Sequence, residues 1–486
     1  MRLIEAMRHK LRSFLQIENV QSNTITLQNL TDFETASYLN IVWSWGDKQA
    51  LDQIYKQLMT EHGTRNFWSV TPTLGIVKRH TGIPGVMVKT LADIVVSDMN
   101  DIKVDERAIE WQDICKTLDM EELITDAIKD TLIVGDGAWK ITIDTNISQY
   151  PMLEFVSGEN VEYTRTRGKI TEVIFKTLVT HNHKRYVLEE TYGNGYINTS
   201  LYDGDNDVPL ETVPAYAGLS PKVTTPTPFM MAIPMMFFKS SRYKGRGRSV
   251  YTGKTDSFDS LDETWSQWLD ALRKGRSKEY IPKSLLPTDY STGEILKPNE
   301  FDNTFIGIES AMGEGDKDKI IVTQPAIPHE SYLSTYVTAL DLCLQGVVSP
   351  STLGIDTKKL DNAEAQREKE KTTLYTRNKI VSTIQKVLPE VIDAMFKTYD
   401  TLNNRDVKDT KSEVTFGEYA NPSFESQVET VSKAKTSGVM STEAAVDELY
   451  GDSKDNEWKA LEVQRLKEEA GVTLMEEPKV AEVPTE

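Results

Sequence analysis

The pattern of apolar and polar positions divides the first half of the chain into a helical part and a β-rich part. Apolar residues recur at helical spacing and predict helices over residues 3–15, 33–58 with a break near Gly46, 86–99, 105–117 and 120–134. After Gly135-Asp136-Gly137 the pattern becomes an alternation of apolar and polar residues, which is typical of half-buried strands. Strands are expected at 139–144, 152–156, 161–166, 170–179, 185–191 and 196–201. Hairpin turns at Gly168-Lys169 and at Gly193-Asn194-Gly195 make this an antiparallel meander.

Residues 256–402 follow a different plan. Apolar residues at 258, 261, 265, 268 and 272 step by 3, 4, 3 and 4, and the same steps recur at 333, 336, 340, 343 and 347. Each set forms one stripe on a helix, so helices are expected at 256–274 and 329–347. Three short strands are expected between them, at 279–286, 303–308 and 319–323. About 45 residues is near the lower limit for a separate core, so this small β-module should pack against neighbours.

A very long helix follows a tight loop that contains Pro350 and Gly354. It is predicted from Asp361 to about Leu402, a length on the order of 60 Å, and Pro389 inside it should produce a kink. Two medium helices separated by a β-insert and followed by such a helix suit a subunit that aligns helices beside its own copies.

The remaining segments are less regular. Residues 209–234 are rich in Pro, Thr and Ala and predict an irregular loop. Helices are expected at 442–450, with Ser441 as N-cap, and at 456–470. Residues 476–486 are acidic, contain proline and are expected to be disordered.

Length and charge limit the classes of function. A chain of 486 residues holds material for about three domains. The formal net charge is −19, from 55 basic and 74 acidic residues, which argues against a protein that grips nucleic acid by neutralising phosphates. A channel through which DNA slides remains compatible with that charge. We expect no transmembrane helix and no secretory signal, because no run of about 18 apolar residues occurs and Met1–Lys10 carries charge throughout. The only cysteines, Cys115 and Cys343, sit in amphipathic helical patterns and are expected as buried thiols of a protein made in a reducing compartment.

Basic candidates for chemistry are few. Gly253-Lys254-Thr255 is similar to the end of a phosphate-binding P-loop, but Arg248 stands where that motif requires glycine. We therefore interpret it as a basic turn before a capped helix. The densest basic run consists of Arg242, Lys244, Arg246 and Arg248. A phosphate contact, an acidic partner surface and a solvated loop all remain open for it.

The acidic and histidine candidates have simple interpretations. Asp256, Asp259, Asp262 and Glu263 could be imagined as a metal site, but a charge bias at a helix start explains them better. His181 and His183 are interpreted as exposed residues of a hairpin turn rather than metal ligands. Lys358 and Lys359 lie on the tight loop, where an ordinary solvated connection is favoured over a transient phosphate contact.

Six short segments are informative through their order and spacing. They are Gly247-Arg-Ser-Val-Tyr-Thr-Gly, Ser260-Leu-Asp-Glu-Thr-Trp-Ser, Arg273-Lys-Gly-Arg, Tyr280-Ile-Pro, Val348-Ser-Pro-Ser-Thr-Leu-Gly and Gly438-Val-Met-Ser-Thr-Glu. With these segments the chain resembles, over most of its length, the portal proteins of long-tailed bacteriophages. The resemblance implies an α+β portal fold whose parts follow one another along the chain. These are a wing at 1–255 with a meander at about 138–203, stem helices at 256–277 and 328–348 around a β-rich clip at 278–327, a tunnel loop at 349–360, a long kinked helix at 361–410, a helical crown at 411–475 and an acidic tail at 476–486.

The resemblance also implies a function without catalysis, cofactor or metal. A portal is a dodecameric ring at one capsid vertex of the virion, assembled in the bacterial cytoplasm, and double-stranded DNA passes through it without sequence specificity. By this resemblance Thr357, Lys358 and Lys359 would face the DNA channel. Lys278, Tyr280, Lys283 and Lys297 of the clip would meet the terminase large subunit and later the head–tail adaptor, and the ring would also contact the major capsid and scaffolding proteins. The alternatives are another phage structural protein, such as a capsid or adaptor component, and a nucleotide-dependent enzyme.

Overall fold

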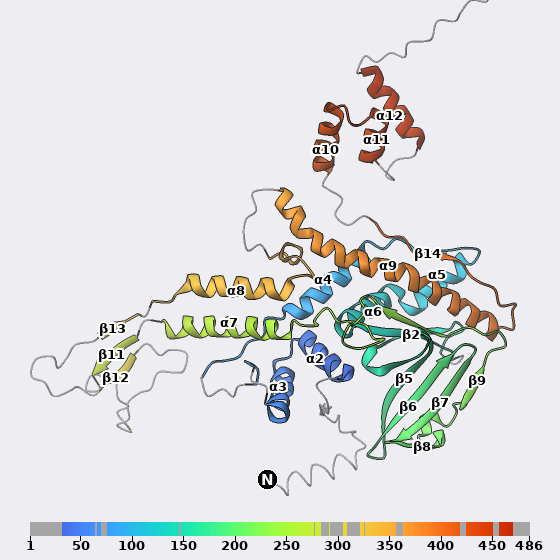
Figure 1. Cartoon of the computed structure of the whole chain (residues 1–486), viewed down its shortest axis with the longest axis horizontal. Coiled ribbons are helices and arrows are strands. Elements are labelled where there is room, and N and C mark those ends of the chain that lie inside the picture. The colour runs from blue at the N-terminus through green and yellow to red at the C-terminus, as the bar shows by residue number, and fades with distance from the viewer. Residues whose placement is uncertain are drawn as a thin grey trace, which may run out of the picture. The chain divides into compact units, whose positions relative to one another are not determined.

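The chain forms two compact units, which meet in sequence at Phe416 and Gly417. The computed structural model describes residues 32–63, 66–69, 75–144, 147–276, 278–282, 291, 305–308, 321–324, 326–355, 363–417, 424–450 and 456–469. The expected helix at 3–15 and the acidic tail at 476–486 lie outside these residues. The described elements mix helices and sheets, which confirms the α+β class (Figure 1).

The N-terminal helices of the first unit agree with the prediction. They are α2 (Phe33–Trp45), α3 (Lys48–His62), α4 (Ile83–Ser97), α5 (Ala108–Leu118) and α6 (Met120–Val134). The expected break falls at Gly46, which ends α2 with a φ of 69°, a left-handed conformation that glycine adopts at little cost. Among the helices that the structure describes, none is long and apolar enough to cross a membrane.

The strands form two sheets where the sequence predicted one meander. The larger sheet follows the predicted order and consists of β4 (Val161–Thr166), β5 (Lys169–His181), β6 (Lys184–Gly193), β7 (Tyr196–Asp203) and β8 (Asn206–Val208), with β9 (Lys222–Thr224) paired to β7. The smaller sheet has β2 (Asp136–Thr142) between β3 (Met152–Ser157) and β10 (Ala232–Met236). The single-sheet prediction is wrong because β2 is buried along nearly its whole length and needs a partner on each edge. β10 supplies one of them from the end of the predicted loop at 209–234.

One large core unites the N-terminal helices with the small sheet and the long helix α9 (Ala363–Leu402). The predicted apolar stripe in the second half of α9 is confirmed, since Val381, Ile384, Leu388, Val391 and Met395 are all buried. The helix continues through Pro389. Under the larger sheet lies a separate small cluster, made of Tyr186, Leu188, Leu201, Leu210 and Val213.

An antiparallel pair of helices leads to and from the small β-module. The helices α7 (Thr255–Lys274) and α8 (His329–Leu344) lie side by side, and β11, β12 and β13 lie at the far end of the pair (Figure 1). In this module β11 (Lys278–Pro282) is central, parallel to β12 (Phe305–Ile308) and antiparallel to β13 (Ile321–Thr323). All five predicted elements of this region are therefore present, although α8 ends three residues before the predicted Val347.

The second unit holds α10 (Phe424–Thr436), α11 (Thr442–Tyr450) and α12 (Asn456–Glu469). Ser441 caps α11 as predicted, since its Oγ accepts a hydrogen bond from the Ala444 amide at 3.2 Å. The predicted start of this unit at residue 411 is wrong. β14 (Ser412–Glu413) pairs with β1 (Lys103–Val104) in the first unit, so the boundary falls after Phe416.

Arg246 joins four separate segments of the first unit. Its guanidinium makes a two-pronged ion pair with the fully buried Asp136, at 3.0 and 2.7 Å, and also donates to the carbonyls of Gly158 and Val161. The same group lies 3.8 Å from the centroid of the Phe33 ring. Arg246 is therefore not available for a phosphate or for an acidic partner, and it is not part of a solvated loop, because its donors bond groups inside the fold.

The neighbouring residue explains why this region also requires glycine. A Cβ atom on Gly247 would lie 2.0 Å from the carbonyl oxygen of Gly135, so the two backbones can approach only without side chains.

Replacing Arg246 should therefore destabilise the first unit strongly. Arg246→Ala leaves the Asp136 carboxylate buried without its cation, and we expect a loss of about 3–5 kcal/mol. Arg246→Lys should recover only part of this, because an ammonium cannot reproduce the planar two-pronged pair. Urea unfolding followed by circular dichroism measures the loss. Lys244→Ala, an exposed neighbour, is the control and should change stability by less than about 0.5 kcal/mol. A loss below about 1 kcal/mol for Arg246→Ala would contradict the role assigned to the pair.

Candidate functional site

Of the seven residues expected to line the channel or to meet partners, only Lys278 and Tyr280 lie in the part of the chain that the structure describes. Thr357, Lys358, Lys359, Lys283 and Lys297 lie outside the described residues. For Lys278 and Tyr280 the backbone is described. Both residues are in β11, where Lys278 is opposite Thr323 and Tyr280 lies between Ile306 and Ile321. The candidate site that can be built from contacts is thus the helix pair α7–α8, with the segments that hold it.

Helix α7 has two different buried faces. Phe258 and Leu261 face the core, and half-buried Trp265 and Trp268 continue the same stripe toward α8. Asp259, Asp262 and Ser266, at steps of 3 and 4, form a second face that is equally buried, with exposed fractions of 7%, 0% and 1%. The interpretation of Asp259 and Asp262 as a simple charge bias at a helix start is therefore wrong.

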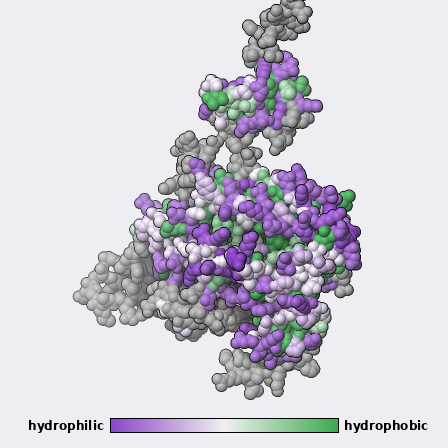
Figure 2. Space-filling model, turned by 45° about the vertical axis from the view of Figure 1, so that its right-hand side comes forward, coloured by the Kyte–Doolittle hydropathy of each residue, from purple (hydrophilic) through white to green (hydrophobic). Residues whose placement is uncertain are grey.

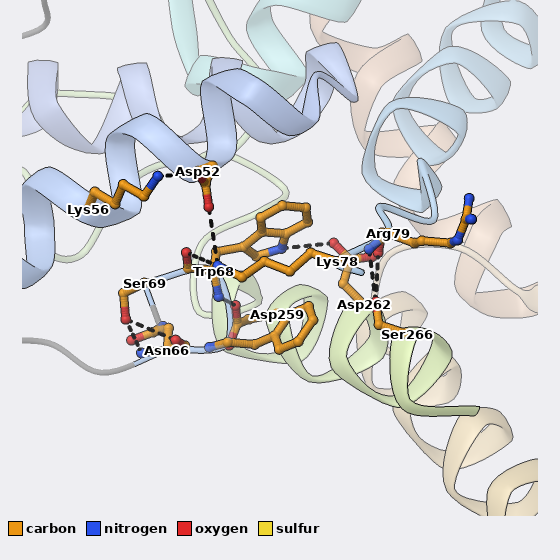
Figure 3. A network of polar contacts seen from close by, with 11 residues as sticks. Asp52, Lys56, Asn66, Trp68, Ser69, Lys78, Arg79, Asp259, Asp262 and Ser266 are labelled. Atoms are coloured by element: carbon orange, nitrogen blue, oxygen red, sulfur yellow. Dashed lines mark hydrogen bonds and ion pairs between the residues drawn. The ribbon is translucent and has the colours of Figure 1, made fainter. Parts of the chain in front are cut away.

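The second face of α7 binds a segment that we call the strap, residues 66–69 and 75–81 (Figure 3). Asp262 receives four hydrogen bonds from it. Oδ1 accepts from the amide and the hydroxyl of Thr81, both at 2.9 Å, while Oδ2 accepts from Trp68 Nε1 at 3.1 Å and lies 2.7 Å from His80 Nδ1. Each of the two oxygens of this buried carboxylate therefore has two hydrogen-bond partners.

Asp259 and Ser266 extend the contact toward the two ends of the strap. The Asp259 carboxylate accepts from the consecutive amides of Phe67 and Trp68, at 2.8 and 3.1 Å. Ser266 Oγ accepts from the Arg79 amide at 2.9 Å. Burial raises the pKa of Asp259 to about 6, because desolvation of its charge, together with the nearby Glu263 and Asp262, outweighs the two amide bonds.

Lys78 connects the strap to the N-terminal helices. Its ammonium donates to the carbonyl of Trp68 at 2.5 Å and to Asp52 of α3 at 3.2 Å (Figure 3). Asp52 also pairs with Lys56 one turn further along α3. Through these bonds the strap lies between α3 and α7 and contacts both.

Aromatic side chains join α7 to α8. Trp268 stacks nearly parallel on Tyr332, with ring centroids 6.3 Å apart and an interplanar angle of 9°. Tyr336 contacts both Trp265 and Trp268, at 5.8 and 6.2 Å. Trp265, Trp268 and Tyr336 belong to the predicted stripes, so these parts of the two stripes face one another, whereas Tyr332 lies outside the stripe predicted for α8.

Lys254, the lysine of the P-loop-like sequence, caps α8 instead of binding phosphate. Its ammonium donates to the carbonyls of Leu342 and Gln345, at 3.1 and 2.8 Å, where the end of a helix leaves carbonyls without internal partners. Desolvation lowers the pKa of Lys254, and burial raises the pKa of the nearby Cys343 thiol to about 12. Cys343 is buried as predicted, whereas Cys115 is only half-buried.

Threonines of α9 hold the chain where it leaves α8. The Ser349 amide donates to Thr373 Oγ1 at 2.9 Å, and the Thr376 hydroxyl donates to the Val347 carbonyl at 2.7 Å. Residues 347–349 are thus fixed against α9 just before the expected tunnel loop. No feature of the sequence pattern indicated these two threonines.

The helix pair carries exposed apolar side chains, two of which, Leu272 and Leu333, belong to the stripes that the sequence predicted as buried. Leu272 of α7 is 45% exposed, and Leu333 and Leu342 of α8 are each 50% exposed. Hydrophilic residues predominate on the face of the molecule shown in Figure 2, with apolar residues scattered between them. Exposed leucines on a helix pair leave apolar area that a further helix can cover.

Other candidate sites carry little chemistry. His181 ends β5, and His183 lies in the following turn with a φ of 64°, so the predicted hairpin is confirmed. Within the described part of the chain, no group of three or more His, Cys, Asp or Glu side chains is placed to hold a metal ion.

The raised pKa of Asp259 predicts a pH dependence of stability. A carboxyl whose pKa is higher in the folded than in the unfolded chain contributes stability that is fully present below about pH 4 and lost as the pH rises through about 6. Between pH 5 and 7.5 the loss should be roughly 1 kcal/mol. Urea midpoints of the natural chain and of Asp259→Asn across this range measure it. The difference between the two curves should follow the stated direction, and parallel curves would contradict it.

Comparisons with known proteins give limited similarity. No protein-family model and no curated protein matches the chain. Among solved structures, the chain is similar to one described as "Neck of native GTA particle computed with C12 symmetry". The two share 13% sequence identity with a TM-score of 0.39, over 76% of this chain and 89% of that one. A likeness of this extent does not indicate a function for the chain.

Proposed function

We propose that the chain is the subunit of a bacteriophage portal, a ring at one capsid vertex through which double-stranded DNA is packaged and later ejected. The observation that carries the proposal is the order of elements from α7 to α9. An antiparallel helix pair starts in the core, carries a small mixed sheet at its far end, and returns to the core before the long helix. This is the stem, clip, stem and long-helix order that the sequence resemblance implies, and four of the six segments that carry the resemblance lie between the start of α7 and the start of α9.

The surfaces of the helix pair suit a ring. A cyclic assembly joins two different faces of each subunit, so every subunit must offer two complementary surfaces. Exposed leucines on both α7 and α8 provide apolar area on both members of the pair. The three-stranded module is also too small for a core of its own, which favours packing against copies of itself.

The charge of the chain is compatible with DNA that moves. A net charge of −19 gives an average repulsion of phosphate, which a few lysines offset locally. In this proposal Thr357, Lys358 and Lys359 face the channel, while Lys278, Tyr280, Lys283 and Lys297 meet the terminase large subunit and then the head–tail adaptor. The ring also contacts the major capsid and scaffolding proteins and remains in the virion. In this proposal the chain itself uses no cofactor, and its P-loop-like lysine, Lys254, donates to helix carbonyls.

Mass and imaging of the purified protein test the proposal. Light scattering should give a mass close to twelve subunits, as the resemblance implies, and negative-stain images should show rings with a central hole. An oligomer without a hole would favour a different phage structural protein, such as a capsid or adaptor component. A monomer that hydrolyses ATP by itself would overturn the proposal in favour of a nucleotide-dependent enzyme.

The role of the loop lysines needs a separate variant. Lys358→Ala combined with Lys359→Ala should leave ring assembly unchanged and alter the amount of DNA packaged, because only contacts with the passing phosphates are removed. Ring images and the packaged DNA per capsid are the two measurements. A double variant that fails to assemble would show that the lysines are structural.

A further inference from the structure

We propose that the strap is a latch, a segment that opens and closes on α7 as one unit and so makes or breaks a polar connection between α7 and α3. The latch follows from contacts of the first unit alone. Its use in a portal, where it would control movement of the stem, rests on the function proposed above.

The closed latch depends on side chains of α7 rather than on secondary structure. The described residues of the strap form neither helix nor strand. Four of its amides, those of Phe67, Trp68, Arg79 and Thr81, donate to side-chain oxygens of α7 instead. These amides all bond to three side chains of one helix, so the strap should separate from that helix all at once. Partial opening would leave buried amide donors without acceptors.

The closed state also contains features that favour opening. Among the described residues, neither Asp259 nor Asp262 forms an ion pair with lysine or arginine, so two buried carboxylates three residues apart are held by neutral donors and by His80. His80 Nε2 is buried with no hydrogen-bond partner among the described residues. Opening would return both carboxylates and this nitrogen to water, which offsets part of the cost of exposing Trp68.

The position of the strap gives the latch a mechanical consequence. When it is closed, α7 is connected through the strap and Lys78 to Asp52 of α3. When it is open, α7 keeps its aromatic contacts with α8 and its core contacts, such as that of Phe258 with Trp43 at 5.6 Å. The latch therefore controls one of the polar connections between the N-terminal helices and the helix pair, while the fold persists.

Hydrogen exchange measured by mass spectrometry on the full-length protein tests the latch. Asp262→Asn keeps the shape of the side chain but cannot accept all four donors, so exchange of the strap amides should accelerate at least about tenfold. Exchange in α4 and α6 should stay within about twofold. Asp270→Asn is the matched control, since Asp270 pairs with Lys274 of its own helix at 2.7 Å and is absent from the described contacts of the four strap amides. It should leave the strap unchanged.

A milder variant covers the case in which Asp262→Asn unfolds the protein. Ser266→Ala removes the single acceptor of the Arg79 amide, and exchange should accelerate at all four α7-bonded strap amides together, not at Arg79 alone. Acceleration confined to Arg79, or equal acceleration in α4 and α6, would overturn the latch. Either result is independent of ring formation, so failure of the latch and failure of the portal proposal can be told apart.

Discussion

The structure depends on one requirement, that the buried carboxylates of α7 find hydrogen-bond donors. Asp259 and Asp262 lie on a helix face that is closed to water, and an ionised group there is tolerated only when it is fully bonded. The donors come from the strap, which lies far earlier in the chain. Trp68, for example, precedes Asp259 by 191 residues. Satisfying α7 therefore also fixes the entry to α4 and the position of α3, so a local polar requirement organises much of the first unit.

The apolar half of the fold could be predicted from the sequence, and the polar half could not. The stripe of Phe258, Leu261, Trp265 and Trp268 is periodic, so the bounds of α7 were predicted to within one residue. Asp259, Asp262 and Ser266 have the same spacing, but acidic residues near a helix start have a sufficient local explanation in the helix dipole. Their partners are backbone amides of a segment without periodicity. Every residue except proline carries such an amide, so the sequence does not indicate which amides bond to α7.

The same reason, that polar contacts depend on distant partners, explains why the predictions for β10, Arg246 and Lys254 differ from the structure. The first three residues of β10 were assigned to an irregular loop, because Pro234 and the preceding Pro- and Thr-rich residues hide a strand that is defined by its partner β2. Arg246 and Lys254 belong to sequences that suggest phosphate binding, yet Arg246 bonds a buried aspartate and Lys254 caps a helix. A sequence shows which charges are present, whereas their use depends on which groups the fold brings near them.

The helix pair α7–α8 is connected at both ends, and this has a consequence for its mechanics. At the core end Lys254, just before α7, bonds the last carbonyls of α8. At the far end β11 and β13, which follow α7 and precede α8, pair in antiparallel register from Lys278 to Tyr280. Sliding one helix along the other by a single turn, about 5.4 Å, would break the bonds at one end and shift the strand register at the other. The pair should therefore tilt or rotate as one rigid arm, and a load applied to the sheet would reach the core without being absorbed between the helices.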